Sequence, residues 1–508
     1  RKWLDTKKKG NELRRFICTG LLGIILGMPV VCQAQACIDE LPTGEDWVRH
    51  VYRDLLPFWS MPEAVGNPEG SFPSFRYRDG SVVDPADSLR EGLDEWEAEF
   101  PTLRQHLDNQ YVRMLSRQTF LYGVGYHITG DERLLALAKV GVDYLLKNAQ
   151  EENGAFFSYF DQGDGQWHPE PGQRTPQDMA YALIGPAFYY YLTRDPEVLQ
   201  AVVKGKEYIF QHYTAEDGRR LRWIDRDFVD AGGDTHSVHQ VRLVGQLDQF
   251  NAYMVLLSPL LTDGKIQKEW KNDLRRLADL LVEEFYSEEH RLFWGDIGPE
   301  GKRFGGDGPD FGHTVKSFWM LYLVSGILED EELEKFALDG MAGTLEEAYL
   351  PEVGAWGLAR EEDGRIVRHR LWWTYAELDQ AAATLGLRDP TFACKLATTY
   401  RYWFETLVDP LYGEVATFID DETGEIWWGK AFSWKNGFHS LEHCLIGYIT
   451  GKAARGKPVD LYYAFLRRPE EDLIRPYYFR GVVEEVTVRD CARLPELKKY
   501  RVRFSGVW

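Results

Sequence analysis

The stretch QTFLYGVGYHI at residues 118–128, followed by ERLLALAKVGVDYLLKN at 132–148, shows the pattern that decides the fold. The first segment is apolar almost throughout, whereas the second carries its charges on one side and its apolar residues at helical spacing. A helix that is apolar on all sides must be buried, and an amphipathic helix can cover it with one face. The pair therefore predicts an inner helix followed by an outer one.

This pairing recurs along the chain. We expect twelve helices, near 44–57, 105–129, 131–149, 176–194, 196–213, 240–261, 265–286, 313–328, 331–348, 371–386, 390–407 and 438–451. Aromatic strands followed by Asp/Gly turns, as after 155–160, 356–359 and 415–419, predict hairpins between them. The expected fold is all-α, an (α/α)6 barrel with short β-hairpins at its mouth. An open solenoid is the alternative, but no repeat of about 34 to 47 residues is visible.

The N-terminus has the layout of a secretory signal peptide. Residues 1–15 are rich in Lys and Arg, Phe16 to Val31 are apolar, and Ala34-Gln35-Ala36 offers small residues for cleavage. The apolar run is short and Pro29 interrupts it, which argues against a membrane anchor. We expect cleavage after Ala36, a periplasmic or secreted protein, and no membrane association afterwards.

The remaining chain divides into two parts. Residues 37–452 form the expected barrel domain. Residues 453–508 differ, because 477–488 are rich in β-forming residues and 500–504 alternate between apolar and basic ones. We expect a small C-terminal β appendage packed on the barrel.

Four cysteines follow the signal segment: Cys37, Cys394, Cys444 and Cys491. They are far apart and lack zinc-site spacing. Export permits a disulfide such as Cys444–Cys491, but the sequence does not assign a pairing.

Charge and aromatic content limit the class of ligand. The chain has 80 acidic and 59 basic residues and a net charge of −21, which disfavours nucleic acid as a partner. Its aromatic fraction is 14%. Aromatic rings fill large cores, and they also stack on sugar faces.

Four segments place polar groups among aromatic ones: RQTFLY at 117–122, GHTVKSFWML at 312–321, LWWTYAEL at 371–378 and WKNGFHSLEH at 434–443. Each opens or lines a predicted inner helix. A barrel would bring all four to one central cavity, although they are far apart in the chain.

In this order, the four segments resemble the N-acylglucosamine 2-epimerase family, which includes cellobiose 2-epimerases and aldose–ketose isomerases. The resemblance covers roughly 105–452. It implies a sugar epimerase or isomerase that acts at C2 without a cofactor. It also implies substrate-site positions for Arg117, His313, Trp372, Trp373, Glu377 and His439.

The residue types suit this chemistry independently. Moving hydrogen at C2 requires removal of a proton next to a carbonyl, and an imidazole titrates near neutral pH. His313 and His439 are the candidate pair of bases, which on opposite faces of C2 would allow inversion. Arg117 would stabilise the enediolate oxygen. Trp372 or Trp373 would stack on the sugar.

Two positions depart from the family pattern. Where the family usually has a further His, the nearest match is Tyr253, and where it usually has Glu after the Gly-His pair, this chain has Lys316. We include both in the predicted substrate site, together with Tyr181. A lysine there would suit an acidic sugar, such as a uronate or a sulfated sugar.

Other interpretations remain open. Arg117 could form a structural ion pair with Glu377, and the two tryptophans could belong to the core. Glu377, Asp178 and Glu442 could supply the carboxylate pair of a glycoside hydrolase, and a polysaccharide lyase or a non-catalytic carbohydrate-binding homologue is also possible.

The histidine spacings and the chain as a whole give weak signals for metal binding and oligomeric state. The spacings His439/His443 and His236/His239 are weak metal signals without an HExxH pattern, so we expect no metal. The expected partner is a small sugar or oligosaccharide, bound by a monomer or homodimer.

Overall fold

The computed structural model describes residues 34–84, 106–170, 174–229, 233, 235–298, 301, 303–304, 310–361 and 363–508. The predicted signal segment therefore lies outside the described residues, apart from Ala34 to Ala36, which belong to a helix over 34–40. Among the helices that are described, none combines the length and apolarity needed to cross a membrane.

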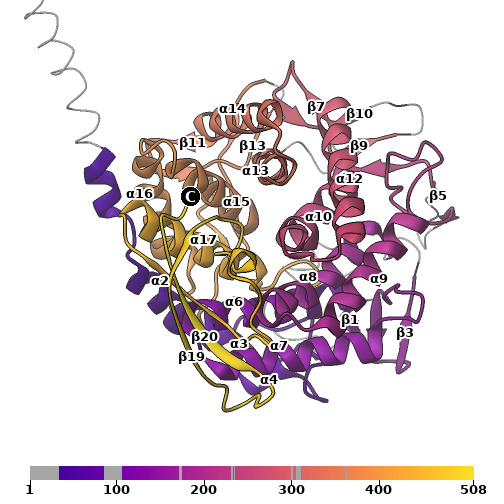
Figure 1. Cartoon of the computed structure of the whole chain (residues 1–508). Coiled ribbons are helices and arrows are strands. Elements are labelled where there is room, and N and C mark those ends of the chain that lie inside the picture. The colour runs from indigo at the N-terminus through magenta and orange to yellow at the C-terminus, as the bar shows by residue number, and fades with distance from the viewer. Residues whose placement is uncertain are drawn as a thin grey trace, which may run out of the picture.

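Six helical segments form a closed inner ring, seen end-on in Figure 1. Each contacts the next, and the last contacts the first. They are α6 (Val112–Thr129), α8 (Pro176–Thr193), the run α10 (Leu243–Gln249), η4 (Phe250–Met254) and α11 (Val255–Leu257), α13 (Phe311–Leu328), α15 (Trp372–Gly386) and α17 (Phe438–Ala454). In α8, only Gln177 is not buried, as expected for a helix enclosed on all sides.

An outer layer of amphipathic helices covers this ring. They are α2 (Gly44–His50), α7 (Glu132–Tyr144), α9 (Pro196–His212), α12 (Gly264–Leu280), α14 (Glu331–Ala348) and α16 (Phe392–Tyr402). Several continue in a further turn: η1 (Val51–Leu55) and α3 (Leu56–Trp59), η3 (Leu145–Ala149), η6 (Leu281–Phe285) and η7 (Trp403–Leu407). Two short helices, α4 (Pro62–Val65) and η5 (Ser258–Leu260), lie in the connections between these elements.

The turns from inner to outer helices share one chemistry. The side chains of Asp131, Asp195, Asp263 and Asp330 accept hydrogen bonds from the first backbone N–H groups of α7, α9, α12 and α14. Asparagine, aspartate and serine stabilise helix N-termini in this way. These capped turns fix each outer helix antiparallel to the inner helix before it.

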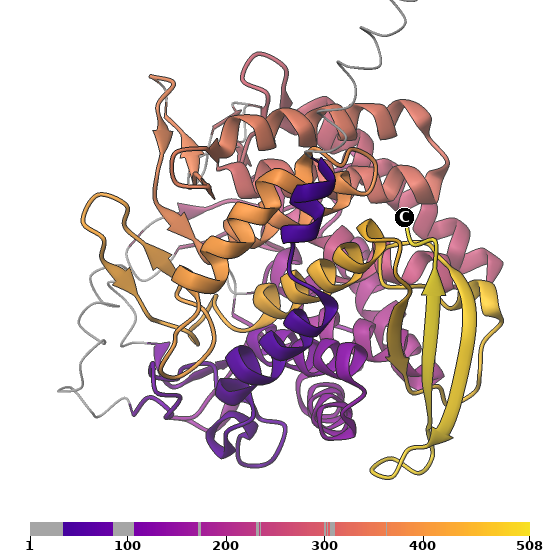
Figure 2. The same cartoon turned by 90° about the vertical axis from the view of Figure 1, so that its left-hand side faces the viewer.

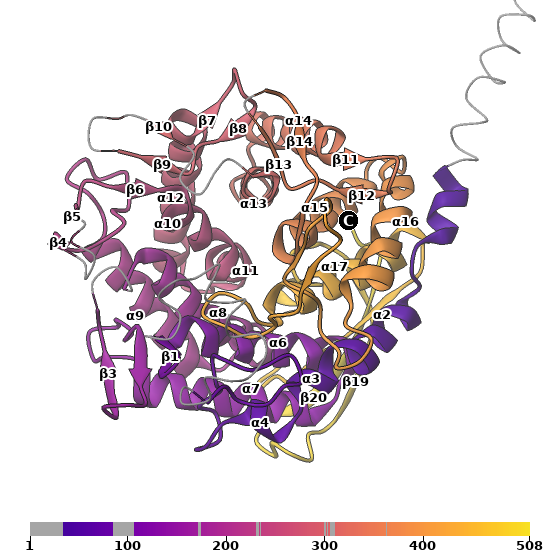
Figure 3. The ribbon, with the colours of Figure 1, turned by 180° about the vertical axis from the view of Figure 1, so that it is seen from behind.

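Hairpins gather at one end of the ring, which faces the viewer in Figure 3. Strands before inner helices pair with these hairpins in three sheets, ordered β1-β2-β3, β10-β9-β6 and β15-β16-β17. The strands are β1 (Asn109–Tyr111), β2 (Tyr159–Asp161), β3 (Gln166–His168), β4 (Phe228–Val229), β5 (Thr235–His236), β6 (Val241–Arg242), β7 (Tyr286–Ser287), β8 (Leu292–Phe293), β9 (Asp296–Ile297), β10 (Arg303–Phe304), β11 (Tyr349–Leu350), β12 (Ala355–Trp356), β13 (Ala359–Arg360), β14 (Ile366–Val367), β15 (Arg370–Leu371), β16 (Phe418–Ile419) and β17 (Ile426–Trp427).

The C-terminal residues form a sheet at the opposite end of the ring, on the right in Figure 2. Its strands are β18 (Val459–Tyr463), β20 (Lys498–Ser505) and β19 (Val482–Asp490), in that spatial order. A short η8 (Glu471–Leu473) lies in the connection from β18 to β19. The hydroxyl of Tyr126 donates to the carbonyl of Tyr463 at 2.8 Å, which ties the sheet to α6.

The structure confirms the all-α prediction and the pairing of inner with outer helices. Two predicted helix starts are wrong. The helix expected over 240–261 begins at Leu243, because Val241 and Arg242 pair with Ile297 and Asp296 as a strand. The helix expected over 105–129 begins at Val112, because Asn109 to Tyr111 pair with Tyr159 to Asp161 as a strand. The spacing of apolar residues cannot reveal such a strand pairing, because the partner strand is distant in sequence.

The cysteine pairing also differs from the example considered. Cys37 is bonded to Cys394, which links the N-terminal segment to α16. Cys444 and Cys491 are buried free thiols. Cys444 faces the outer layer, where its Sγ lies 3.4 Å from the carbonyl oxygen of Trp47, so it does not reach Cys491.

Candidate active site

Each inner helix contributes one buried polar side chain at the same height. Arg117, Tyr181, Asp248, Lys316 and Glu377 are each the sixth residue of their helical segment, and Glu442 is the fifth of its own. All six are buried. We call these six residues the polar layer.

Imidazole and indole rings lie one turn closer to the hairpins. His313, Trp373 and His439 stand in the first turns of α13, α15 and α17. The ring centroid of Trp373 lies 4.5 Å from that of His313 and 6.2 Å from that of His439. The structure therefore brings the two predicted bases together beside one indole.

Gly312 explains how the indole reaches α13. A Cβ atom at this position would lie 2.6 Å from the Trp373 ring and 2.8 Å from the hydroxyl of Thr374. Only glycine permits so close an approach. In the Gly-His pair, the glycine therefore lets the Trp373 indole pack on α13, and the next residue supplies the imidazole.

Asp310 fixes the position of the His313 ring and raises its pKa. Its carboxylate accepts from the backbone N–H of His313 at 2.7 Å, and its second oxygen lies 2.5 Å from Nδ1 of the ring. Burial would lower the pKa of His313, but the charge and hydrogen bond of Asp310 outweigh it and raise the pKa above its usual 6.5. Because the side chain is 34% exposed and Nδ1 is occupied, Nε2 is the nitrogen available to a ligand.

His439 has the opposite environment. It is buried, and burial together with the charges of Arg117 and Lys316 holds its pKa well below 6.5. Its Nδ1 has no hydrogen-bond partner and lies 3.4 Å from Oε1 of Glu377. His439 is therefore neutral near pH 7, whereas His313 favours the charged form.

Arg117 is held without a carboxylate partner among the described residues. One guanidinium N–H donates to the carbonyl of Trp434 at 2.9 Å, and the group lies 3.7 Å above the Tyr181 ring. Its Nε bonds to none of the described residues. The ion pair with Glu377 that the sequence left open is thus not formed, and the cation remains available for a developing negative charge.

Lys316 is not free for a substrate anion. Its Nζ lies 2.7 Å from a carboxylate oxygen of Asp248 and 3.4 Å from the hydroxyl of Tyr181. Burial would lower the pKa of Lys316, but the adjacent Asp248 charge raises it. The expectation that this lysine would recognise an acidic sugar loses its basis, because Asp248 already neutralises the ammonium group.

Glu377 and Glu442 form a buried carboxyl pair. Their oxygens and a ring nitrogen of His439 all lie within 4.8 Å of one another. Burial raises the pKa of Glu377 to about 8 and that of Glu442 to about 7. The hydroxyl of Tyr477, from the C-terminal segment, donates to Glu442 at 2.6 Å.

The two adjacent tryptophans have different roles. Trp372 is buried with its ring centroid 6.1 Å from His439, and the ammonium group of Lys435 lies 5.2 Å from its ring. Trp373 is only partly buried and contacts both histidines. Trp373 is therefore the ring that a sugar can reach.

Tyr253 does not join this group. Its hydroxyl donates to Gln249 at 2.8 Å, and its ring packs against Trp270 of the outer helix α12. The polar residue that this inner segment contributes is Asp248, which sequence reasoning missed. A charged residue in an otherwise apolar helix was the signal that could have identified it.

The other residues considered have structural partners. Asp178 forms a 2.8 Å ion pair with Arg113, and its carboxylate accepts at 2.7 Å from the hydroxyl of Thr175, the N-cap residue of α8. His443 points to the outer layer, with Nε2 2.8 Å from Asp379 and its ring 4.1 Å from that of Trp403. His236 stacks on Phe228 in the β4–β5 hairpin.

Glu414 supports the start of α17. Its carboxylate accepts from Trp59 and Ser440 at 2.7 Å each, and it lies 3.2 Å from Nζ of Lys435. All of these groups are buried. This network fixes the loop that precedes His439, and sequence reasoning did not identify it because its members are far apart in the chain.

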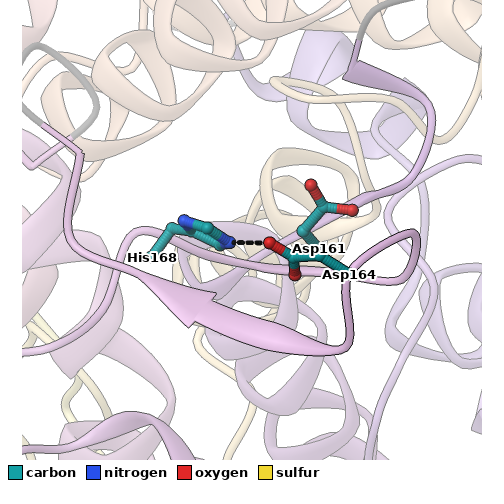
Figure 4. A group of neighbouring side chains, drawn as sticks. All are labelled: Asp161, Asp164 and His168. Carbon is teal, nitrogen blue, oxygen red and sulfur yellow. Dashed lines mark hydrogen bonds and ion pairs between the residues drawn. The ribbon is translucent and has the colours of Figure 1, made fainter.

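Among the residues that the structure describes, two groups of side chains have the ligand types of a metal site. Asp161, Asp164 and His168 lie on the β2–β3 hairpin, where His168 hydrogen-bonds Asp164 at 2.9 Å (Figure 4). In the second group, Glu377, His439 and Glu442, the neighbouring Lys316 and Arg117 already supply positive charge, which disfavours an additional cation.

A closed ring of paired helices with an imidazole pair at one end defines a barrel protein with a polar interior. Residues 103–433 match the N-acylglucosamine 2-epimerase (GlcNAc 2-epimerase) family, and the chain belongs to this family. The matched span contains Arg117, His313 and Glu377 and ends before His439.

Individual relatives agree with this assignment. The chain is 26% identical over 359 residues to a cellobiose 2-epimerase from Eubacterium cellulosolvens, which covers 64% of this chain and 79% of the relative. Its fold is similar to that of a sugar epimerase from a ruminal bacterium (TM-score 0.65, 18% identity) and of the cellobiose 2-epimerase from Bacillus thermoamylovorans B4167 (TM-score 0.64, 14% identity). Each similarity covers 80% of this chain and 98% of the other.

Proposed function

We propose that this protein is a carbohydrate epimerase or isomerase that moves the C2 proton of a reducing sugar. Membership of the family supports the reaction class. The structural observation that carries the proposal is the placement of His313 and His439 beside Trp373 with opposite shifts in pKa.

The two histidines would divide the proton transfer. His439, which is neutral, accepts the proton from C2 of the open-chain sugar, and the electrons of the C–H bond move into a C1–C2 double bond as the carbonyl oxygen becomes an enediolate. His313, whose charged form Asp310 favours, donates a proton from Nε2 to the opposite face of C2, and the C1 carbonyl re-forms to give the epimer. Protonation at C1 instead, with transfer of the O2 proton to O1, gives the ketose.

Arg117 would stabilise the enediolate oxygen. Its buried guanidinium has no carboxylate partner among the described residues, so its charge is not already compensated. Because Lys316 is neutralised by Asp248, we extend the proposal to neutral rather than acidic sugars.

The geometry does not favour the glycoside hydrolase alternative. Hydrolases hold their carboxyl groups roughly 5 to 10 Å apart on either side of the bond that is cleaved. The oxygens of Glu377 and Glu442 lie within 4.8 Å of each other, at the short end of this range, and both side chains are buried. Asp178 is paired with Arg113.

Export is also part of the proposal. The bond between Cys37 and Cys394 supports it, because disulfides persist mainly in oxidising compartments. N-terminal sequencing of the protein recovered from outside the cytoplasm should begin at Cys37. Recovery of the intact N-terminus from the cytoplasm would contradict export.

The reaction is tested by product analysis. The purified protein is incubated with cellobiose, with neutral aldoses and with glucuronate, and products are identified by NMR. We expect the 2-epimer or the ketose from a neutral sugar. Release of new reducing ends from oligosaccharides, without any change at C2, would contradict the proposal.

A further inference from the structure

A short segment of the C-terminal region closes the ring beneath the polar layer. Tyr477 and Tyr478 are buried and stack on each other, with ring centroids 3.9 Å apart. The Tyr478 ring also packs against Trp319 of α13, and the Tyr477 ring against Phe188 of α8. We call these two residues the tyrosine floor.

The floor is fixed in position by the inner helices. The hydroxyl of Tyr191, on α8, donates to the carbonyl of Arg475 at 2.6 Å and accepts from the backbone N–H of Tyr477 at 2.8 Å. Tyr477 has a positive φ of 57°, which is costly for a residue with a bulky side chain. The surrounding contacts hold this conformation, and it aims the phenol at the ring interior.

The Tyr477 hydroxyl reaches the carboxyl pair. It donates to Oε1 of Glu442 at 2.6 Å, and Glu442 lies beside Glu377 and His439. Gln380 donates to the other carboxyl group, Glu377, at 3.3 Å. Two carboxylates in a buried space repel each other, so one bound proton stabilises the pair.

Two neighbouring acceptors are suited to that proton. In the described structure, Oε1 of Gln380 and Nδ1 of His439 are buried without a hydrogen-bond partner. A carboxyl O–H on Glu377 or Glu442 is the type of donor that they lack. The hydrogen bonding of the cluster is therefore more complete with one proton on the pair than with two ionised carboxylates.

We propose that the C-terminal segment is part of the catalytic apparatus: Tyr477 positions Glu442 against Glu377 so that the two carboxyl groups share one proton beside His439. When Glu377 holds the proton, it donates to Nδ1 of His439. When Glu377 is ionised, it accepts from N–H at Nδ1 and leaves Nε2 as the base. The pair thereby selects the tautomer of His439, and no atom is gained or lost. This catalytic consequence rests on the proposed function, whereas the shared proton does not.

Other titratable groups surround the pair and His439. They are Lys316, Asp248, Arg117, Lys435, Tyr478 and His313. Lys316 favours ionisation of both carboxyl groups, and Asp248 opposes ionisation of Glu377. The Tyr477 hydroxyl also favours the ionised form of Glu442. Its removal must therefore raise the pKa of the pair.

The test compares Tyr477→Phe with Tyr478→Phe in the full chain. Both changes remove one buried hydroxyl from the floor, but the Tyr478 hydroxyl donates to the backbone carbonyl of Asn251 at 2.9 Å rather than to a carboxyl group. Infrared titration without sugar follows the C=O band of protonated carboxyl groups. The part of this band that is lost in Glu442→Gln and Glu377→Gln belongs to the pair.

We expect Tyr477→Phe to move the midpoint of this band up by about one pH unit, because a hydrogen bond to a charged group is lost, and Tyr478→Phe to leave it unchanged. An unchanged midpoint in Tyr477→Phe, or no protonated band from the pair near pH 6, would overturn the proposal even if the protein epimerises sugars. If the band shifts as expected but the protein has no C2 activity, the shared proton is supported. Only the proposed function is then contradicted.

Activity provides the second readout if the protein turns over sugar. Tyr477→Phe should lower kcat about tenfold with little change in KM, since Tyr477 acts through Glu442 and does not touch the sugar. A change in KM alone would show that the residue shapes the binding site instead, and would overturn the positioning role.

Discussion

The first turns of α13 and α17 carry the same kind of side chain in opposite surroundings. His313 is partly exposed and held by Asp310, which raises its pKa, whereas burial and then the charges of nearby cations lower the pKa of His439. The two helices occupy equivalent places in the ring. The comparison shows that the fold sets where the histidines stand, while burial and the neighbouring charges set their pKa values in opposite directions.

The largest expected effect tests whether both histidines are needed. We expect His439→Asn and His313→Asn each to reduce kcat/KM by about a thousandfold, because each removes one proton-transferring group. Steady-state product formation measures this. His290→Asn, on an exposed turn, is the matched control. If either site variant kept more than half the activity, one histidine would suffice as the base. The claim that the two histidines have separate roles would then be wrong.

The second effect concerns Lys316, whose charge lowers the pKa of both histidines. Lys316→Met leaves Asp248 and the carboxyl pair without their ammonium partner. We expect the free energy of unfolding to fall by about 3 to 5 kcal/mol, as when one member of a buried ion pair is removed. Urea denaturation at pH 7 measures it.

The control for this prediction is the double variant Lys316→Met with Asp248→Asn. It removes both charges and should recover most of the lost stability. Equal destabilisation in the single and double variants would show that Lys316 acts by packing and not by charge.

The third effect is a shift in pH dependence caused by Asp310→Asn. A histidine with a raised pKa contributes ion-pair stability at low pH, and this is lost as the pH rises through that pKa. If charged His313 is the acid, activity falls over the same range. Removing the carboxylate lowers the pKa, so the alkaline fall in kcat/KM should begin about one pH unit lower.

The pH profile of kcat/KM and NMR titration of the imidazole protons measure this shift. Asp263→Asn is the matched control, because Asp263 caps α12 and contacts no histidine ring. An unchanged profile in Asp310→Asn would mean that another group sets the charge of His313.

Much of the ring could be predicted from the spacing of apolar residues, because inner helices are apolar on all sides and outer helices on one face only. The prediction failed where a partner strand decides the structure, as at Asn109 to Tyr111. It also failed at Tyr253. Matching the sequence to the family pattern selects Tyr253, but this residue lies in the π-helical turn Phe250–Met254, where its hydroxyl bonds Gln249. Asp248, which precedes this turn, is the residue that contacts Lys316.

The site was predictable in its residue types and not in its pairings. His313, His439, Arg117 and Trp373 are brought together as the motifs implied. The sequence gives no indication that Lys316 is neutralised by Asp248 or that Tyr477 contacts Glu442, because these pairs are 68 and 35 residues apart. Such contacts depend on closure of the ring, which no local pattern encodes.

The central claim is that two histidines of opposite protonation exchange the C2 proton of a sugar with solvent. Incubation of the protein with a turned-over aldose in heavy water, followed by NMR of C2, tests it most directly. The account predicts deuterium at C2 in the epimer and in recovered substrate, no deuterium in either when His439 is replaced by Asn, and no epimer when His313 is replaced by Asn. Formation of the epimer with its original hydrogen still at C2 would contradict it.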